Sequence, residues 1–516
     1  MSSIKTILFT LASLLISSLV FSQSQSSIKR DIAQGTFEPN YESLNKYQTP
    51  EWFRDAKFGI WAHWGPQCEP EKGDWYAVNM YKGFYKDGKQ GDVYLYHLKN
   101  YGHPSQFGFK DIINLWKAQN WKPDVLMKLY KAAGAKYFVA MANHHDNFDN
   151  WDSKYQPWNS VNMGPKKDLI AGWASAARKE GLHFGVTVHA ARAWSWYEIT
   201  QGTDTSGAFK GVPYDGKMTK DDGKGKWWAG YDPQDLYAQN HPLKTKPDQP
   251  YIDKFFNRTK DLIDKFHPDL LYFDDSNLPL GEAGLNIAAH YYNANKKWNN
   301  GKLEAVLNAK KMPESQRSSL VLDIERGGSD KLDPLPWQTD ECIGQWHYNK
   351  GIKYREAGSI INMLIDIVSK NGNLLLSIPV RADGTIDSLE VNFLKKMGTW
   401  MKINGEGIYG TRPWKIYGET FTIIDKNDNR KNSFSAKDVR YTTIDGYLYV
   451  FLLGTPSSDI SINTLGTSAG FSSRIKSIQL VGSKEKIKWE QKGDALAIVK
   501  PLSFPTEYAV TFKISF

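Results

Sequence analysis

Cysteine is scarce in this sequence: its 516 residues include only two, Cys68 and Cys342. Two cysteines cannot build a disulfide framework or a thiolate metal cluster, and their spacing does not decide whether they pair. The sequence also lacks H-E-x-x-H and the usual zinc-ligand spacings, so it predicts no metal site. No stretch of the sequence repeats.

Long apolar runs are missing too, apart from one at the N-terminus. Lys5 precedes an apolar run at residues 7–21, and Val20-Phe21-Ser22 comes just before a polar stretch. This pattern is typical of a signal peptide, which we place at residues 1–22. No later segment is long and apolar enough to cross a bilayer. We therefore expect an exported protein, periplasmic or extracellular, that has no membrane partner once the signal is removed.

Positive charge is in excess, with a formal net charge of +9, but no DNA- or RNA-binding motif accompanies it. Nucleic acid is therefore discounted as a partner. Much of the charge lies in a Gly-rich run at residues 210–226, which contains Lys210, Lys217, Lys220, Lys224 and Lys226. Such a run is usually a solvated loop. It would also attract an anionic glycan, such as a sulfated or uronic polysaccharide.

Length and composition favour a large domain followed by a smaller one. From about residue 50 to 405, short apolar runs alternate with amphipathic stretches, which indicates repeated βα units and an α/β barrel. The predicted strands are residues 58–62, 137–142, 184–188, 270–273, 320–324 and 374–378. The predicted helices include residues 169–179, 252–266 and 354–368. Residues 190–242 are expected to form an extended loop on the catalytic face.

After residue 407 the apolar pattern changes to a period of two, as at residues 447–453 and 508–516. Turn residues separate these runs, so this region is predicted to be a β-sandwich. The predicted domains are a barrel at residues 28–407 and a sandwich at residues 413–516.

Polar residues follow five of the predicted strands. They are His63, the run Asn143-His144-His145-Asp146, His189, the pair Asp274-Asp275, and Glu325. Active sites of α/β barrels lie at the C-terminal ends of the strands. One such residue could be a satisfied structural group, but five at the same topological position indicate a site.

Asp274 is a candidate catalytic carboxylate. Glycosidic bond cleavage needs one carboxylic acid to protonate the leaving oxygen and one carboxylate to meet the developing oxocarbenium ion. Asp274 would emerge from a buried strand into the mouth of the barrel, which suits the second role. Capping a helix or binding a backbone amide is the structural alternative. By strand alternation, Asp275 should point to the other face.

Glu325 suits the first role, because a carboxyl group at a strand end near apolar walls is in the setting a general acid needs. A structural ion pair with a nearby arginine is the alternative. His144 and His145 would not chelate one ion unless the backbone turns there, because neighbours on a strand point to opposite sides. Binding of sugar hydroxyls suits them better, since imidazole both donates and accepts hydrogen bonds.

Several longer motifs occur between Trp52 and Trp414. They are KFGIWAHWG at residues 57–65, NHHD at 143–146, WDSKY at 151–155, WNS at 158–160, KDL at 167–169, WQT at 337–339, IG at 343–344, SKNGNLLL at 369–376 and NGEGIY at 404–409. On these motifs the sequence resembles the α-L-fucosidase family, glycoside hydrolase family 29.

The resemblance implies a (β/α)8-like barrel with a C-terminal antiparallel β-sandwich, no cofactor, and retention of anomeric configuration through a covalent glycosyl-enzyme. It implies that Asp274 is the nucleophile. The acid/base position varies in the family; we assign it to Glu325, with Glu341 and Glu282 as weaker candidates. The expected substrate-binding residues are His63, Asp74, Trp75, His144, His145, His189 and Trp346.

Two departures from the family pattern bear on the choice of sugar. Asp74 stands where the family commonly has a glutamate and is one methylene shorter. Thr187-Val188-His189 stands where many members have a Tyr-rich strand end. Because an apolar pocket rejects an added hydroxyl only weakly, these changes favour tolerance of L-galactose, which is L-fucose with a hydroxyl on C6.

We therefore expect a secreted, retaining exo-α-L-fucosidase whose partner is a glycan with terminal α-L-fucosyl residues. The alternatives are an α-L-galactosidase of the same fold acting on an algal polysaccharide, sulfated or not, and a non-catalytic glycan-binding protein. A metal-dependent hydrolase ranks lowest. The sequence predicts no oligomeric state, and it leaves open whether the sandwich packs on the barrel or binds polysaccharide.

Overall fold

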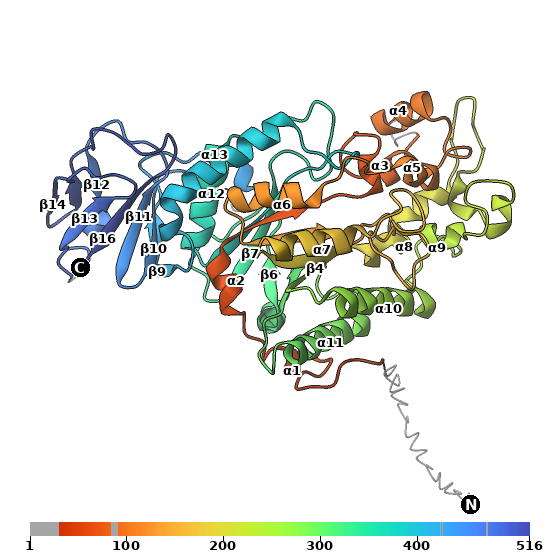
Figure 1. The fold of residues 1–516 in the computed structure, drawn as a ribbon, viewed down its shortest axis with the longest axis horizontal. Helices are drawn as coiled ribbons and strands as arrows, with labels where there is room; N and C mark the ends of the chain where they lie inside the picture. Colours follow the sequence, from red (N-terminus) through yellow and green to blue (C-terminus); the bar gives the residue numbers. More distant parts are fainter. Residues whose placement is uncertain (1–29, 84–90, 424, 426, 471–472) are drawn as a thin grey trace, which may run out of the picture. The chain divides into compact units, whose positions relative to one another are not determined.

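The computed structural model describes residues 30–83, 91–423, 425, 427–470 and 473–516 (Figure 1). Ile32–Phe516 forms one compact unit. The predicted signal peptide at residues 1–22 lies outside the described residues. Cys68 and Cys342 are two separate, buried thiols.

Eight parallel strands close into a barrel, which confirms the predicted fold. Each strand pairs with the next along the chain, and the last returns to the first, where Phe58 lies beside Leu374. Most of their side chains are buried, because both faces of such a sheet are covered. The strands are β1 (Phe58–Ala62), β2 (Tyr137–Met141), β3 (His183–Val188), β4 (Leu270–Ser276), β5 (Val306–Lys310), β6 (Val321–Asp323), β7 (Trp337–Cys342) and β8 (Gly372–Ser377).

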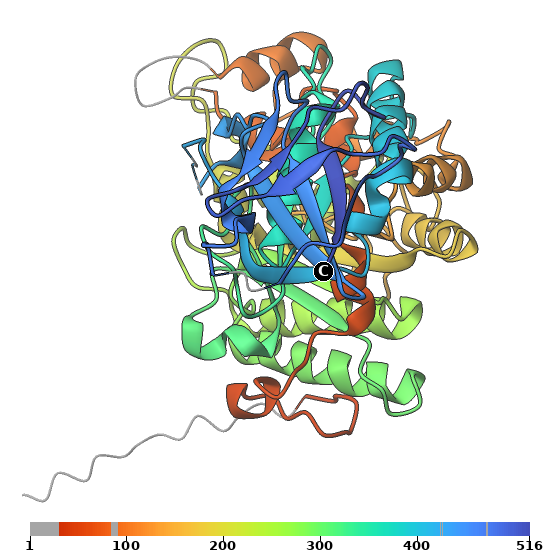
Figure 2. The ribbon, with the colours of Figure 1, turned by 90° about the vertical axis from the view of Figure 1, so that its left-hand side faces the viewer.

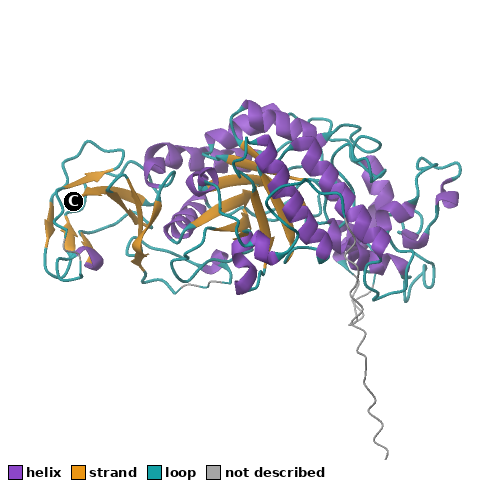
Figure 3. Ribbon diagram, turned by 90° about the horizontal axis from the view of Figure 1, so that it is seen from below, coloured by secondary structure: helices purple, strands orange, loops and turns teal. Residues whose placement is uncertain are grey.

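Helices surround the barrel strands (Figures 1 and 3). They are α1 (Tyr41–Leu44), α2 (Glu51–Ala56), α3 (Tyr76–Asn79), α4 (Asp92–Asn100), α5 (Phe109–Leu115), α6 (Pro123–Ala132), α7 (Leu169–Lys179), α8 (Ala193–Trp196), α9 (Pro233–Tyr237), α10 (Gln249–Phe266), α11 (Glu282–Trp298), α12 (Ala357–Ser369) and α13 (Ser388–Asn404). The amphipathic pattern decides how they lie: α10 buries Phe255, Phe256 and Ile263. None of the helices in the described part of the chain has an apolar stretch that could span a bilayer.

The sequence pattern located six of the eight strands and three of the helices to within a few residues. It missed β5 and β7, which carry polar side chains along their length. In β7, Gln338 and Asp340 are fully buried and bond to other polar groups inside the barrel: Gln338 donates to Asp323 at 2.8 Å, and Asp340 accepts from the Tyr272 hydroxyl at 3.0 Å. A strand whose inward side chains are polar does not show the apolar run on which the prediction relied.

Residues 190–242 do not form the extended loop that we expected. They contain α8, α9 and four short 3-10 turns, and they share a buried polar cluster with earlier parts of the chain. At its centre the Asp215 carboxylate accepts hydrogen bonds from Tyr81 and Tyr237, each at 2.7 Å, and pairs with Lys110 at 2.8 Å. A buried carboxylate with three partners fixes the segment as compact structure, because leaving those groups unpaired is costly.

The C-terminal region forms two antiparallel sheets (Figure 2), which confirms the predicted sandwich. One has the order β13-β16-β11-β10-β9 and the other β12-β15-β14. Leu448, Val450 and Leu452 belong, with Leu496 and Phe512, to a separate apolar core. The strands are β9 (Arg412–Glu419), β10 (Val439–Ile444), β11 (Tyr447–Leu452), β12 (Ile460–Ile462), β13 (Ser477–Leu480), β14 (Trp489–Gln491), β15 (Leu496–Ile498) and β16 (Val510–Ser515).

Polar contacts join this sandwich to the barrel domain. The Arg440 guanidinium pairs with Asp366 of α12 at 2.6 Å, and Trp400 of α13 donates its indole N–H to the Ala509 carbonyl at 2.9 Å. Arg440 is fully buried. Because a buried ion pair holds only when both partners stay in place, these contacts favour a packing role for the sandwich.

Candidate active site

A small cavity of about 130 Å³ opens at the C-terminal ends of the barrel strands. It brings together eight of the nine residues that the sequence nominated, and His189, the ninth, contacts one of them from below. The lining residues are His63, Asp74, Trp75, His144, His145, Arg192, Asp274, Asp275, Ser276, Lys310, Lys311, Glu325, Trp346 and His347. Neither Glu341 nor Glu282 is among them.

Asp274 lies near the end of β4 with a positive or polar group on each carboxylate oxygen. The Lys310 ammonium contacts Oδ1, and His189 Nδ1 lies 3.1 Å from Oδ2. Burial by itself would raise the pKa of Asp274, but Lys310, together with His189 and His145, more than offsets this, and the net pKa lies below the usual value. Asp274 is therefore held ionised, as a nucleophile must be.

Lys310 is the central cation of the site, and the sequence analysis missed it. Its ammonium contacts Asp274, lies 2.9 Å from Glu325 Oε2 and lies 3.3 Å from Asp340 Oδ2. Burial lowers the pKa of Lys310, but the surrounding carboxylates raise it further, so the side chain stays charged. The available signal was its place at the end of a short strand, which went unseen because β5 itself was not predicted.

Glu325 lies where predicted, but its surroundings are not the apolar walls that we expected. The strand β6 ends at Asp323, so Glu325 lies on the turn that follows, and 46% of its side chain is exposed. Its ion-pair partner is Lys310 rather than the neighbouring arginine. Arg326 instead lies over the Trp346 ring, 4.8 Å from its centre.

Asp275 also lines the cavity, contrary to the expectation from strand alternation. The register between β4 and β5 shifts between Phe273 and Ser276, and this irregularity interrupts the alternation. Burial, followed by the charge of Asp274, raises the pKa of Asp275 to about 8. Arg192 lies 3.7 Å away and offsets only part of this shift. Near neutral pH, Asp275 is therefore largely protonated beside an ionised Asp274.

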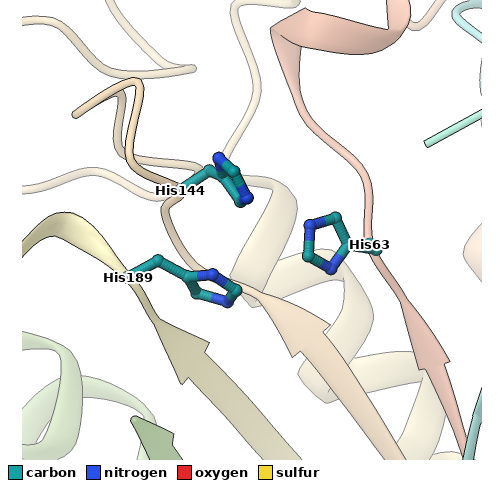
Figure 4. A group of neighbouring side chains, drawn as sticks. All are labelled: His63, His144 and His189. Carbon is teal, nitrogen blue, oxygen red and sulfur yellow. The ribbon is translucent and has the colours of Figure 1, made fainter. Parts of the chain in front are cut away.

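Four histidines line the cavity, and His189 lies beside it against Asp274. His63, His144 and His189 come from the ends of β1, β2 and β3, and Figure 4 shows their rings around a common space. Burial lowers the pKa of all three, to about 3 for His189. Neutral imidazoles have one donor and one acceptor nitrogen, which suits the binding of hydroxyl groups.

His144 and His145 both reach the cavity because β2 ends at Met141 and the chain turns after it. The opposite orientation that a straight strand would impose therefore does not apply. His144 Nδ1 lies 2.8 Å from Gln67 Nε2, and His145 donates its Nδ1–H to the His189 carbonyl at 2.7 Å. These contacts fix both rings in place.

Aromatic side chains complete the walls. Trp75 has a left-handed backbone conformation and remains 40% exposed, so it lies at the rim. Trp346 packs on Trp61 with ring centres 5.4 Å apart.

The Asp74 carboxylate accepts a hydrogen bond from the His347 amide at 2.7 Å and lies 3.4 Å from the Trp346 amide. His347, which also lines the cavity, was not predicted.

The two weaker acid/base candidates lie outside this group of residues. Glu341 is fully buried and lies 3.2 Å from Arg355 and 3.8 Å from Arg326. Glu282 is an exposed residue in the first turn of α11. Of the three glutamates considered, only Glu325 lines the cavity with Asp274.

A barrel that holds two close carboxyl groups, hydrogen-bonding imidazoles and aromatic walls at its strand ends is the architecture of a glycoside hydrolase. The comparisons with known proteins agree. The chain matches the family model of alpha-L-fucosidase over residues 24–406 and that of the alpha-L-fucosidase C-terminal domain over residues 431–515.

The chain therefore belongs to the alpha-L-fucosidase family, glycoside hydrolase family 29. It is 26% identical over 511 residues to tissue alpha-L-fucosidase of Rattus norvegicus, with 94% of each chain covered. It is also 26% identical over 527 residues to the same enzyme of Homo sapiens, with 96% of each covered. A structure of Thermotoga maritima alpha-fucosidase in complex with fucose matches with 25% identity and a TM-score of 0.68, over 92% of this chain and 99% of that one.

The family membership defines the activity in outline. The protein is a glycoside hydrolase with alpha-L-fucosidase function, and its substrate is a fucoside carbohydrate.

Proposed function

We propose that the protein is a retaining exo-α-L-fucosidase in which Asp274 is the nucleophile and Glu325 the acid/base. The observation that carries this proposal is that both carboxylates contact the same Lys310 ammonium. Two such contacts limit the separation of these oxygens to about 6 Å. Retaining enzymes hold their carboxyl groups about 5–5.5 Å apart, whereas inverting enzymes need about 6.5–9.5 Å.

In the first step, Asp274 attacks the anomeric carbon while Glu325 gives its proton to the departing glycosidic oxygen. The bond from sugar to aglycone breaks, and a bond from sugar to Asp274 forms. In the second step, Glu325 removes a proton from water, which attacks the same carbon and releases Asp274. Two inversions leave the configuration unchanged.

The dimensions of the cavity support exo action. Its volume of about 130 Å³ is well below the roughly 300–1,000 Å³ of pockets for drug-sized ligands. Such a space suits one sugar unit, enclosed by His63, His144 and Trp346, with the rest of the glycan outside the rim.

The test uses Asp274→Ala and Glu325→Ala, with Glu282→Ala as the matched control because Glu282 is exposed and away from the cavity. We expect Asp274→Ala to lose turnover of an aryl α-L-fucoside. We expect azide to restore part of the activity of Glu325→Ala and to give the α-fucosyl azide, because azide replaces water in the second inversion, while the control behaves as wild type. Absence of azide rescue would move the acid/base role elsewhere, and an inverted product would exclude the two-step mechanism.

A second candidate substrate is an α-L-galactoside. Asp74 supports it, because this short side chain is held by the backbone amides of residues 346 and 347 and leaves more of the cavity to the sugar. The test compares the kcat/KM of aryl α-L-fucoside and aryl α-L-galactoside. Preference for the galactoside would keep the mechanism and change the substrate.

We further propose that the natural glycan is anionic. Lys210, Lys217, Lys220, Lys224 and Lys226 are all exposed, in the segment that connects β3 to β4. The ends of these strands carry His189 and Asp274, so the segment belongs to the catalytic side of the barrel. Replacing all five lysines by glutamine should weaken both the binding of a sulfated fucan and the salt dependence of that binding. The matched control replaces five exposed lysines of the sandwich, Lys484, Lys486, Lys488, Lys492 and Lys500; a larger effect there would assign glycan binding to the sandwich.

We propose export to the periplasm or beyond the cell. The support is the apolar N-terminal segment with its small-residue site at Val20-Phe21-Ser22. N-terminal sequencing of the protein made in its own cells should begin near Gln23, and a mature chain that still begins at Met1 would contradict export by this route.

A further inference from the structure

Five of the eleven histidines in the chain gather at the active site. Three of these, His63, His144 and His189, form a tighter group in which each ring offers a nitrogen within 4.8 Å of the other two. Figure 4 shows that the rings come from the ends of three neighbouring strands. The barrel therefore holds the group in place before any ligand arrives.

The spacing of the three rings is that of a metal site. Their centres are 5.0 Å apart for His63 and His144, 5.3 Å for His63 and His189, and 4.9 Å for His144 and His189. Three imidazoles bound to one tetrahedral zinc through Zn–N bonds of about 2.0–2.1 Å have ring centres about 5 Å apart. The nearly equilateral arrangement thus requires ring rotation but little movement of the backbone.

The surroundings also suit a ligand. His63 Nδ1 is buried and has no hydrogen-bond partner among the described residues. The Asp274 carboxylate lies 3.1 Å from His189 and adds negative charge beside the group. The Gln67 amide, which faces His144 Nδ1, serves either tautomer of that ring, because a flip exchanges its donor and acceptor.

We propose that His63, His144 and His189 bind one divalent transition-metal ion, with Zn²⁺ as the representative. Imidazole ligands select such ions over Mg²⁺ and Ca²⁺. A three-histidine site leaves a fourth position open toward the cavity. The ion occupies the space where the sugar hydroxyls bind, so it inhibits the hydrolase reversibly. The binding itself does not depend on the proposed function; only the inhibition rests on it.

The first experiment titrates the wild-type protein with Co²⁺ and follows the intense visible absorption of tetrahedral Co²⁺. We expect one equivalent to bind and Zn²⁺ to displace it. His63→Gln and His189→Gln should each weaken binding at least about tenfold, since each removes one of three ligands. The control is His183→Gln, because His183 is partly exposed and stacks on Trp52 away from the cavity. Equal binding by the control and both variants would overturn the site.

A second measurement needs no variant, so it decides the matter even if the variants fold poorly. X-ray absorption of the zinc-loaded wild-type protein should show three imidazole ligands. Fewer than two would overturn the proposal.

Inhibition is measured separately with an aryl fucoside at low concentration. At a free Zn²⁺ concentration about ten times its Kd, competition should lower the rate about 11-fold. Binding without inhibition would place the ion outside the sugar site and overturn that part of the proposal. If the protein fails to cleave fucosides at all, the Co²⁺ titration still tests the metal site, so the two failures are distinguishable.

Discussion

Replacing Lys310 with methionine is the most informative single perturbation of the site. Methionine keeps much of the aliphatic length but removes the charge. Asp274 then loses the ammonium on Oδ1, and Glu325 and Asp340 lose their shared cation. Asp274 remains mostly buried, with only 16% of its side chain exposed.

The expected loss in the free energy of unfolding depends on which of the three ion pairs of Lys310 are buried and ionised. Removing one partner of a buried ion pair costs about 3–5 kcal/mol. Glu325 is 46% exposed, so its share is small. Burial, followed by the charge of Asp323, raises the pKa of Asp340, and this carboxyl group keeps the Tyr272 hydroxyl as a second partner, so its share is smaller than that of Asp274. Asp274 therefore dominates, and we expect the free energy of unfolding at pH 7 to fall by about 3 kcal/mol.

The lowered pKa of Asp274 also determines how the stability loss in Lys310→Met varies with pH. The folded pKa of Asp274 is lowered, so its contribution to stability is present above its unfolded pKa and is lost as the pH falls through the folded value. The deficit of Lys310→Met should therefore be smallest at low pH, where Asp274 is protonated in both proteins, and should grow with pH until Asp274 also ionises in the folded variant. Without the ammonium, burial raises the pKa of Asp274, so the acidic limb of kcat/KM should move to higher pH.

Urea unfolding at several pH values and the pH profile of fucoside hydrolysis check these expectations, with Lys310→Arg as the charge-conserving control. An unfolding deficit below about 1 kcal/mol at pH 7, or the same deficit at pH 7 and pH 4, would refute the assignment of Lys310 as the cation that holds Asp274 ionised.

Three further predictions concern other charged groups. The raised pKa of Asp275 makes wild type lose stability as the pH rises from about 4 to 8. Asp275→Asn should therefore gain stability relative to wild type over that window, by at most about 1.4 kcal/mol per pH unit. Urea unfolding measures this difference in free energy, and a difference that stays constant with pH would contradict the prediction. Glu341→Gln should show no azide rescue, because Glu341 lies outside the cavity; rescue would reassign the acid/base. Arg440→Met should lower stability by about 1.5–3 kcal/mol, because Asp366 loses one of its two buried cations and keeps only Lys370. An unchanged melting temperature would show that the sandwich contact is dispensable.

Much of the fold could be predicted from local pattern because most barrel strands are apolar on both sides. The runs at β1, β2, β3 and β8 contain almost only buried residues, most of them apolar, and the sequence located each to within a few residues. β5 and β7 carry Asn308, Gln338 and Asp340 inward, and no local rule separates such strands from loops.

The site could be predicted in part for a similar reason. Residues that directly follow a recognised strand, such as His63, His189 and Asp274, share one end of the barrel by topology alone. Lys310 and His347 could not be found in this way, because the first ends an unrecognised strand and the second lies in a loop. Their roles depend on contacts between residues far apart in the chain, as between Lys310 and Asp274.

The compact structure of residues 190–242 was hidden for yet another reason. Its stability rests on Asp215, whose partners Tyr81 and Lys110 lie 134 and 105 residues earlier. A polar, Gly-rich segment reads as a loop when its distant partners are unknown.

The polar interior beneath the cavity explains both the strands that the sequence pattern missed and the charge of Asp274. A series of buried polar groups leads from Asp274 down into the barrel: Lys310, Asp340, Tyr272, Asp323, Gln338 and Tyr137. Tyr137 donates a hydrogen bond to Gln338 at 3.1 Å. An apolar interior would be easier to stabilise, because every buried polar group needs a partner. The network fixes the position and charge of the nucleophile from below. Local rules therefore fail at β5 and β7 for the same reason that Asp274 is held ionised: both strands carry the groups that hold the nucleophile.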